Sequence, residues 1–473
     1  MADERMHASS LPTEITLHIS SYLPQSTLVN VSLVCRTWRL GILSILFSSI
    51  ALTNDECIAR FSRTITHGGK INSASPISQY IRSLIIASDS ITKPITELGL
   101  APLASCIPYL AQLARLHWRI SFVPANGDVL GLFQSRCPQL KSVSLLVPDG
   151  HQFKNNLGES HYATLLGFKN LSEFKLQVHH IPPDLGTKAF GPLKGLVSHC
   201  PNLEFLQLYF LNPELRSACY TLDDVATWLG LEVFMPSLRR FHLLGSVQID
   251  EASLVSSPDN GTHYFRNFLT RHAHLEELHL NCVSLASFSE TADPEHLAQA
   301  LPSLKRFSGP DVLCDLLVRS SVAKRLERLS IDECSFKAGI SFVPHRPPRV
   351  LPLPMLRELV IGTNMFYPVL TILELLLPEA PSLERLGLVP IPPACHAMFL
   401  DLVSHTPRLQ KTSIFNSTPA IIDPVGPNQQ TAGDVAQHRL YVEMKKVCPE
   451  LDVTRAWLAG VVLDKREAES RIY

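Results

Sequence analysis

The stretch LEFLQL at 203–208 carries the pattern that decides the fold, because its apolar residues stand at the first, fourth and sixth positions. The same six-residue pattern returns in LRRFHL at 238–243 and LEELHL at 275–280. Nine further copies occur, the one at 304 being degenerate: IRSLII (81–86), LARLHW (113–118), LKSVSL (140–145), LSEFKL (171–176), LKRFSG (304–309), LERLSI (326–331), LRELVI (356–361), LERLGL (383–388) and LQKTSI (409–414). Each copy predicts a short strand, and steps of 22 to 37 residues between copies indicate a repeat architecture.

Helical patterns fill the intervals between these strands. Examples are GPLKGLVSHCPN at 191–202 and LTILELLLPEAP at 370–381, each with a proline shortly before the next strand. One strand and one helix cannot bury their apolar faces alone, so neighbouring repeats must stack and share a core. Parallel strands would then line the inner side of a curved solenoid, with helices outside. The arrangement resembles a leucine-rich-repeat horseshoe, and a more general α/β solenoid is the alternative.

A second region, LPTEITLHISSYLPQSTLVNVSLVCRTWR at 11–39, predicts short helices with apolar residues on more than one face. Ile15, Ile19, Tyr22 and Leu23 make one helical stripe, while Leu33 and Val34 point away from the stripe that contains Leu28. A module of roughly 40 residues cannot cover so much apolar surface by itself. A partner is therefore expected to complete it.

These residues resemble the F-box, the motif that docks a protein onto the Skp-type adaptor of cullin-based ubiquitin ligases. The likeness rests on Leu-Pro-x-Glu-Ile at 11–15, Leu-Val-Cys-Arg at 33–36 and Trp38 at its fixed distance. It implies that a set of residues meets the adaptor while the other apolar residues pack inside: Leu11, Pro12, Ile15, Leu33, Val34, Cys35 and Trp38. The alternative is that these helices only cap a larger domain. Since many F-box proteins carry leucine-rich repeats, the resemblance implies an α/β chain with a three-helix F-box followed by an irregular leucine-rich-repeat solenoid.

The predicted boundaries follow from these patterns: an F-box at 8–52, a linker helix region at 53–80, the solenoid at 81–416, a Pro/Gly/Gln-rich loop at 417–437 and capping helices at 438–473. Polar insertions are expected at 147–168 and 245–262. A proline-rich run lies within 332–354, where it is either a stiff connector or a polyproline ligand.

Composition excludes several classes of protein. The net charge is −1 and no Lys/Arg run exceeds a pair, so neither nucleic acid nor an anionic membrane surface is an expected partner. No stretch approaches the roughly 20 apolar residues that span a bilayer, and the charged MADERMHASS start does not resemble a secretion signal. We expect a soluble protein of the cytoplasm, the nucleus or both. Eleven cysteines without a CxxC pair favour reduced packing residues over disulfides or zinc.

A search for chemistry finds no catalytic constellation. The cluster His272, His274, Glu276, Glu277 and His279 contains metal-type ligands, but alternation along the strand lets only Glu277 and His279 project together. Two ligands do not make a zinc site, so neither a metal nor another cofactor is predicted. The sequence therefore favours a non-catalytic binding protein, with an enzyme of unrecognised type as the least favoured alternative.

The expected function is the substrate-recognition subunit of a Skp–cullin–F-box ubiquitin ligase, monomeric within its complex. A non-degradative repeat scaffold is the alternative. Alternation along the strands assigns the third and fifth residues of each repeat, with Tyr209 beside them, to the concave face that would bind an unknown protein target: Phe205, Gln207, Tyr209, Arg240, His242, Glu277, His279, Arg306, Arg328, Arg385 and Lys411. Phe205 and Tyr209 would hold an apolar anchor, and Arg306, Arg328 and Arg385 an acidic or phosphorylated segment. The alternative for this arginine-rich end is a solvated charged face.

Overall fold

The computed structural model describes residues 12–67, 70–71, 75–88, 94–120, 122, 128–147, 165–179, 190–211, 220–250, 252–255, 263–285, 292–333, 342, 349–362, 366–388, 391–414 and 432–451. The chain divides into two compact units, described separately below. Unit 1 comprises Met1–Glu214 and Trp228–Ser237, and unit 2 comprises Leu215–Thr227 and Leu238–Tyr473. Leu11 lies outside the described residues, as do residues 417–431 of the loop predicted at 417–437 and residues 452–473 of the predicted capping helices.

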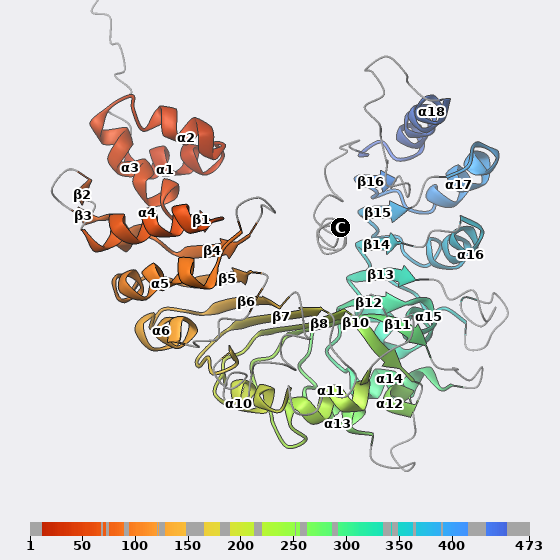
Figure 1. Ribbon diagram of the computed structural model, residues 1–473. Helices are drawn as coiled ribbons and strands as arrows, with labels where there is room; N and C mark the ends of the chain where they lie inside the picture. Colours follow the sequence, from red (N-terminus) through yellow and green to blue (C-terminus); the bar gives the residue numbers. More distant parts are fainter. Residues whose placement is uncertain are drawn as a thin grey trace, which may run out of the picture. The chain divides into compact units, whose positions relative to one another are not determined.

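Each unit contains parallel strands that neighbour one another in chain order (Figure 1). Unit 1 has β1 (Ser49–Leu52), β4 (Ser83–Ala87), β5 (Arg115–Arg119), β6 (Ser142–Val147), β7 (Glu173–His179) and β8 (Phe205–Leu211). Unit 2 has β10 (Arg240–Ile249), with β9 (Tyr220–Thr221) paired to it, followed by β11 (Glu277–Leu285), β12 (Arg306–Pro310), β13 (Arg328–Glu333), β14 (Glu358–Ile361), β15 (Arg385–Leu388) and β16 (Lys411–Ile414). The predicted α/β fold with a parallel sheet is confirmed.

Every predicted copy of the six-residue pattern forms a strand, and each strand begins at the third residue of its copy. A repeated hydrogen-bond arrangement sets this register. The carbonyl of the second residue accepts from the second and third amides of the next copy, as Arg239 does from Glu276 and Glu277 at 2.9 and 3.0 Å. The next step is identical, since the Glu276 carbonyl accepts from the amides of Lys305 and Arg306.

The leucines of the pattern build the core. In LEELHL, the first, fourth and sixth residues, Leu275, Leu278 and Leu280, are fully buried, whereas Glu277 is not. Figure 1 shows helices along one face of the strands in each unit. We call the opposite face, which carries the third and fifth residues of each copy, the polar face.

The helices that follow the strands are short. In unit 1 they are α4 (Asp55–Thr66), α5 (Glu97–Cys106), α6 (Asp128–Arg136) and α10 (Pro192–Ser198). Helix α11 (Leu222–Leu229) contains the boundary between the units, and unit 2 has α12 (Ala252–Val255), α13 (Tyr264–Arg271), α14 (Pro294–Ala300), α15 (Asp311–Val318), α16 (Phe366–Leu376), α17 (His396–Val403) and α18 (Ala432–Val447). Short 3-10 turns are η2 (Ile77–Tyr80), η3 (Ile107–Tyr109), η5 (Ser321–Arg325) and η6 (Pro393–Cys395), and β2 (Lys70–Ile71) pairs antiparallel with β3 (Ser75–Pro76).

The repeat array begins earlier than residue 81. Strand β1 pairs in parallel with β4 from Ser49↔Ser83 to Leu52↔Ile86, and the Ser48 carbonyl accepts from the amides of Arg82 and Ser83. The stretch FSSIAL at 47–52 is thus a further copy of the pattern, and the predicted start of the solenoid at residue 81 is too late. Helix α4, within the predicted linker at 53–80, follows this strand as outer helices follow the others.

Two predicted insertions are shorter than expected. Strand β10 continues to Ile249, and Val247 and Ile249 are buried, because the apolar alternation persists beyond the six-residue copy. At the other insertion, Leu165 and Phe168 are buried parts of the core. Helix α18 begins at Ala432, inside the range predicted as loop.

Three cysteines that precede a proline, at 137, 200 and 448, are packing residues, as predicted for the cysteines in general. Cys137, Cys200 and Cys448 are buried, each just before the turn that leads to the next strand or ends α18. Burial raises the pKa of the Cys137 thiol to about 12 and also raises the pKa of Cys448. Such thiols are poor nucleophiles at neutral pH.

Candidate interaction surfaces

Three helices form the N-terminal domain of unit 1: α1 (Thr13–Ser21), α2 (Gln25–Val31) and α3 (Arg36–Leu46). Pro12 and Pro24 occupy the positions before α1 and α2, and their carbonyls accept the first helical bonds from Thr16 and Leu28 at 3.1 and 3.0 Å. Cys35 begins α3, where its Sγ accepts from the Trp38 amide at 3.5 Å. Two prolines and one cysteine therefore set where the helices start.

The interior of this domain is small. Among the side chains of this domain that the structure describes, the buried apolar ones are Leu28, Ile42 and Leu43. Hydroxyl side chains are buried beside them, among them Ser32, which donates to the Val29 carbonyl at 2.6 Å. Such a core cannot receive every apolar residue of the segment.

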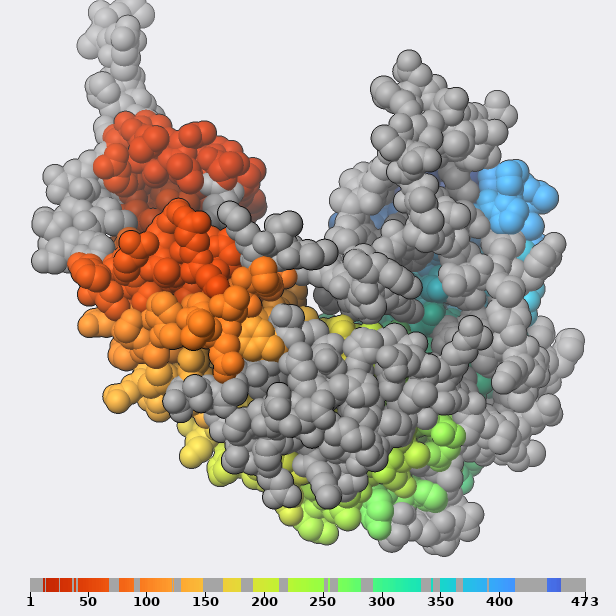
Figure 2. All heavy atoms as spheres, in the orientation of Figure 1, coloured from red at the N-terminus to blue at the C-terminus, as the bar shows by residue number. Residues whose placement is uncertain are grey.

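The excess apolar side chains lie on the surface. Of the fourteen exposed large apolar residues in the described part of the chain, six fall in this segment: Ile15, Ile19, Tyr22, Val29, Leu33 and Val34. Leu33 and Val34, 67% and 66% exposed, stand in the turn between α2 and α3. Figure 2 shows the domain, in red, forming an exposed end of unit 1.

The structure separates the residues that the F-box resemblance assigns to the adaptor. Pro12, Ile15, Leu33 and Val34 are exposed, whereas Cys35 and Trp38 are half-buried. Ile19, Tyr22 and Val29 were expected to pack inside the module, and that expectation is wrong, since they are 40%, 76% and 47% exposed. The helical stripe Ile15–Ile19–Tyr22 was the signal that could have revealed them.

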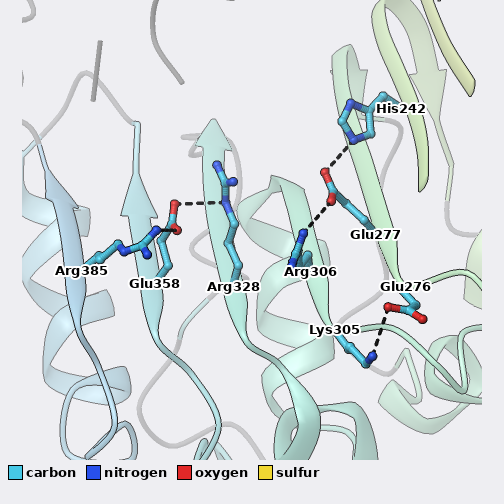
Figure 3. Close-up of polar contacts among 8 residues, drawn as sticks. All are labelled: His242, Glu276, Glu277, Lys305, Arg306, Arg328, Glu358 and Arg385. Atoms are coloured by element: carbon cyan, nitrogen blue, oxygen red, sulfur yellow. Dashed lines mark hydrogen bonds and ion pairs between the residues drawn. The ribbon is translucent and has the colours of Figure 1, made fainter. Parts of the chain in front are cut away.

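On the polar face of unit 2, neighbouring strands place the third residues of their copies side by side. The register runs Arg240↔Glu277↔Arg306↔Arg328↔Glu358↔Arg385↔Lys411. We call these seven positions the charge row. Figure 3 shows that its carboxylates reach sideways to cations on adjacent strands.

Glu277 is held between two partners. Its Oε1 lies 2.8 Å from His242 Nε2 and its Oε2 lies 3.4 Å from Arg306 Nη1. Burial alone would raise the pKa of Glu277, but the hydrogen bond and charge of His242, with the charges of Arg306 and Arg328, lower it to about 2. Glu277 is therefore ionised at any physiological pH.

Glu358 joins the next two arginines. Its Oε1 lies 3.2 Å from Arg328 Nε and its Oε2 lies 3.3 Å from Arg385 Nη1. The carboxylate is almost buried between them, while the side chains of Arg328 and Arg385 remain 31% and 45% exposed. Arg328 and Arg385, which were predicted to bind an acidic target, are thus already paired within the sheet. Because the single Glu358 carboxylate serves both arginines, the group of three keeps a net positive charge.

A second cluster lies further along the strands. The Asp332 carboxylate accepts from His279 Nε2 at 2.8 Å, from Ser308 Oγ at 2.7 Å and from Ser330 Oγ at 2.9 Å. Burial would raise the pKa of Asp332, but the charge and hydrogen bond of His279 and the two hydroxyl donors lower it overall. Glu277 and His279 project from the same face, as predicted, but they have different partners. Glu277 pairs with residues of β10 and β12, and His279 pairs with Asp332 of β13.

The remaining predicted target residues have mixed positions. Phe205 is only 5% exposed, with Lys175 Nζ 5.2 Å from its ring centroid, so it cannot serve as the expected accessible anchor. Tyr209 meets His179 edge to face, and Gln207 is half-buried. These residues belong to unit 1, whereas the charge row belongs to unit 2.

The rest of the histidine cluster is structural. His272 is buried, with Nδ1 2.7 Å from the Phe268 carbonyl oxygen, and burial lowers its pKa to about 4. Within the described residues, no group of three or more His, Cys, Asp or Glu side chains is arranged to hold a metal ion. Among the same residues, no helix has the length and apolar character needed to cross a membrane.

Comparison with known proteins identifies the N-terminal domain. Residues 8–51 match the F-box-like family model, so the chain carries an F-box-like domain, as the sequence predicted. The match extends over this domain and not over the repeats. F-box domains and leucine-rich repeats are modules of protein–protein interaction. No curated protein matches the chain.

Solved structures similar to the chain have low scores. A chain of the Rad7–Elc1 complex from yeast is 13% identical with a TM-score of 0.38, over 87% of this chain and 91% of that one. The leucine-rich-repeat protein LegL7 from Legionella pneumophila is 14% identical with a TM-score of 0.39, over 86% and 99%. A Bacteroides fragilis protein reaches 0.34 at 13% identity, over 60% and 75%. TM-scores of this size carry no argument about function.

Proposed function

We propose that this protein is the target-recognition subunit of a Skp–cullin–F-box ubiquitin ligase. The observation that carries the proposal is the F-box-like domain with six exposed apolar side chains around a minimal core. Leaving that surface in water is unfavourable by about 25 cal/mol per Å² of apolar area, so a partner that covers it gains affinity. The Skp-type adaptor, with a cullin bound to it, is the partner proposed.

The repeats would hold the target. The leucines of the repeats are buried in the core, so the side chains available to bind a target are those of the polar face. The chain itself would catalyse no bond formation. Its contribution is to raise the effective concentration of target lysines near the activated ubiquitin. We expect one copy per complex, in the cytoplasm or nucleus, without nucleic acid or membrane contact.

Capture of a Skp-type adaptor by the full chain tests this proposal. The double variant Leu33→Ser/Val34→Ser should weaken adaptor binding by about thirtyfold or more, because each removes an exposed apolar contact from the proposed interface. The matched control is Leu98→Ser/Tyr109→Ser, which removes two exposed apolar residues of unit 1 outside the F-box-like domain. Equal adaptor capture by both variants would contradict the proposal.

A non-degradative scaffold remains the second candidate, because the same two modules could assemble a complex without ubiquitin transfer. Cullin distinguishes the two functions. A ligase subunit brings down the adaptor together with cullin, and the Leu33→Ser/Val34→Ser variant loses both. Recovery of the adaptor with no cullin would favour the scaffold.

A further inference from the structure

The charge row contains two places where cations face each other directly across adjacent strands. Arg306 on β12 is the register partner of Arg328 on β13, and Arg385 on β15 is the register partner of Lys411 on β16. Like charges at directly opposed positions are destabilising. We call these two places the cation gaps.

No carboxylate of the residues that the structure describes fills the cation gaps. Glu277 on β11 pairs with Arg306 on β12. Glu358 on β14 pairs with Arg328 on β13 and Arg385 on β15. Each carboxylate is therefore on the far side of its arginine from the gap. Lys411 makes no ion pair with any other described residue. From β11 to β16 the row has four cations and two carboxylates, which leaves a net charge of +2.

The positions beside the row are small. The fifth residues of the same copies are Ser308 and Ser330, which are register partners, followed by Val360 and then Gly387 opposite Ser413. On β10 and β11 the equivalent residues are the two histidines His242 and His279. A polypeptide backbone could approach the sheet more closely over β12 to β16 than over β10 and β11.

We infer that the charge row of β12 to β16 binds an extended acidic segment whose two carboxylates occupy the two cation gaps. The gaps are three strand spacings apart, which is about 14 Å at ~4.8 Å per spacing. An extended chain advances ~3.4 Å per residue, so the two carboxylates should stand four residues apart. Two carboxylates also balance the net charge of +2 that the row carries when Glu277 of β11 is included.

The neighbouring charges limit where such a segment can lie. Asp332 stands four residues beyond Arg328 on β13, so the acidic ligand should cross the strands along the row and not run up them. In unit 1 the equivalent row has Arg115, Ser142 and Glu173 in register, a balanced set. Along these third positions, the excess of positive charge is therefore confined to unit 2. The inference rests on the proposed function in that the segment would belong to the ubiquitination target.

Fluorescence anisotropy with the full chain, without any adaptor, tests the inference. The probes are labelled Gly/Thr peptides with two glutamates spaced i,i+2, i,i+4 or i,i+7, and a matched peptide with two glutamines. We expect the i,i+4 peptide to bind about tenfold more tightly than the glutamine peptide at low salt, and less tightly as salt rises. Equal binding of the three glutamate spacings would overturn the assignment.

Substitutions then locate the binding. Arg328→Gln/Lys411→Gln removes one cation from each gap, while Glu358 keeps Arg385 as its partner. It should abolish the preference for glutamate. Lys305→Gln/Arg357→Gln, with the same change of charge at positions preceding the row, should retain it. If Arg328→Gln/Lys411→Gln retained the preference for glutamate, the carboxylate assignment would be overturned. A further probe, the i,i+4 peptide with two phosphothreonines in place of the glutamates, would overturn it if that peptide alone bound. Adaptor capture by the same preparation reports separately on the proposed function.

Discussion

The F-box-like domain exposes several of its apolar residues, whereas the repeats bury the leucines of their pattern. In the domain, a core of Leu28, Ile42 and Leu43 leaves Leu33 and Val34 in water. In the repeats, leucines such as Leu206 and Leu278 are fully buried, and the accessible face is made of charged and polar residues. The first surface suits a partner that removes apolar area from water, and the second suits a partner selected by charge.

The largest expected effect is on the repeat core. Leu206→Ala in unit 1 and Leu278→Ala in unit 2 should each lower the free energy of unfolding by about 2–5 kcal/mol, since each leaves a cavity. Gln207→Ala, at the half-buried position beside Leu206, should change it by no more than about 0.5 kcal/mol. Denaturant unfolding measures all three. A Gln207→Ala loss as large as that of Leu206→Ala would mean that the two faces are assigned the wrong way round.

The next effect concerns the adaptor. At a concentration 100 times its Kd, a bound adaptor should stabilise the F-box-like domain by about 2.7 kcal/mol. Amide hydrogen exchange should therefore slow in α1 to α3, while the strands β10 to β16 exchange as before. Slower exchange confined to the repeats would reverse the roles assigned to the two regions.

A smaller effect follows from Glu277. Its pKa of about 2 in the folded protein lies below its ordinary value of 4.5, so the unfolded chain takes up a proton first as the pH falls. The stabilisation is complete above pH 4.5 and is lost toward pH 2, by an amount on the order of 1–2 kcal/mol. Unfolding measured between pH 6 and pH 3 should show a shallower decline for Glu277→Gln than for wild type.

The control for this pH dependence is Glu276→Gln, which removes a neighbouring, more exposed carboxylate. Its profile should keep the wild-type slope in the acid range. If both variants flatten the profile equally, the stabilisation does not come from the contacts of Glu277 with His242 and Arg306.

The smallest expected effect is at the exposed apolar residues themselves. Leu33→Ser/Val34→Ser should change the free energy of unfolding of the adaptor-free protein by about 0.5 kcal/mol or less, because these side chains make little internal contact. The same variant should self-associate less, as measured by light scattering. A large loss of stability would show that the two residues serve the fold and not a partner.

The sequence alone determined the repeat register and the F-box-like domain. Alternation with a period of two fixes which side chains face the helices, so LEELHL predicted the burial of Leu275, Leu278 and Leu280 correctly. The apolar spacing predicted short helices at the N-terminus, and the resemblance of the Leu-Pro-x-Glu-Ile and Leu-Val-Cys-Arg motifs to the F-box predicted the domain that they form. The copy FSSIAL also has apolar residues at its first, fourth and sixth positions, although the predicted solenoid did not include it.

Only the tertiary structure decided which polar residues are partners and which apolar residues remain outside. The pairing of Glu358 with Arg328 and Arg385 joins positions 30 and 27 residues apart, and such a pairing depends on which strands become neighbours. The burial of Phe205 and the exposure of Ile19 and Tyr22 likewise depend on the volume that each core can fill. Local pattern sets the direction of a side chain, whereas its surroundings come from residues that only folding brings together.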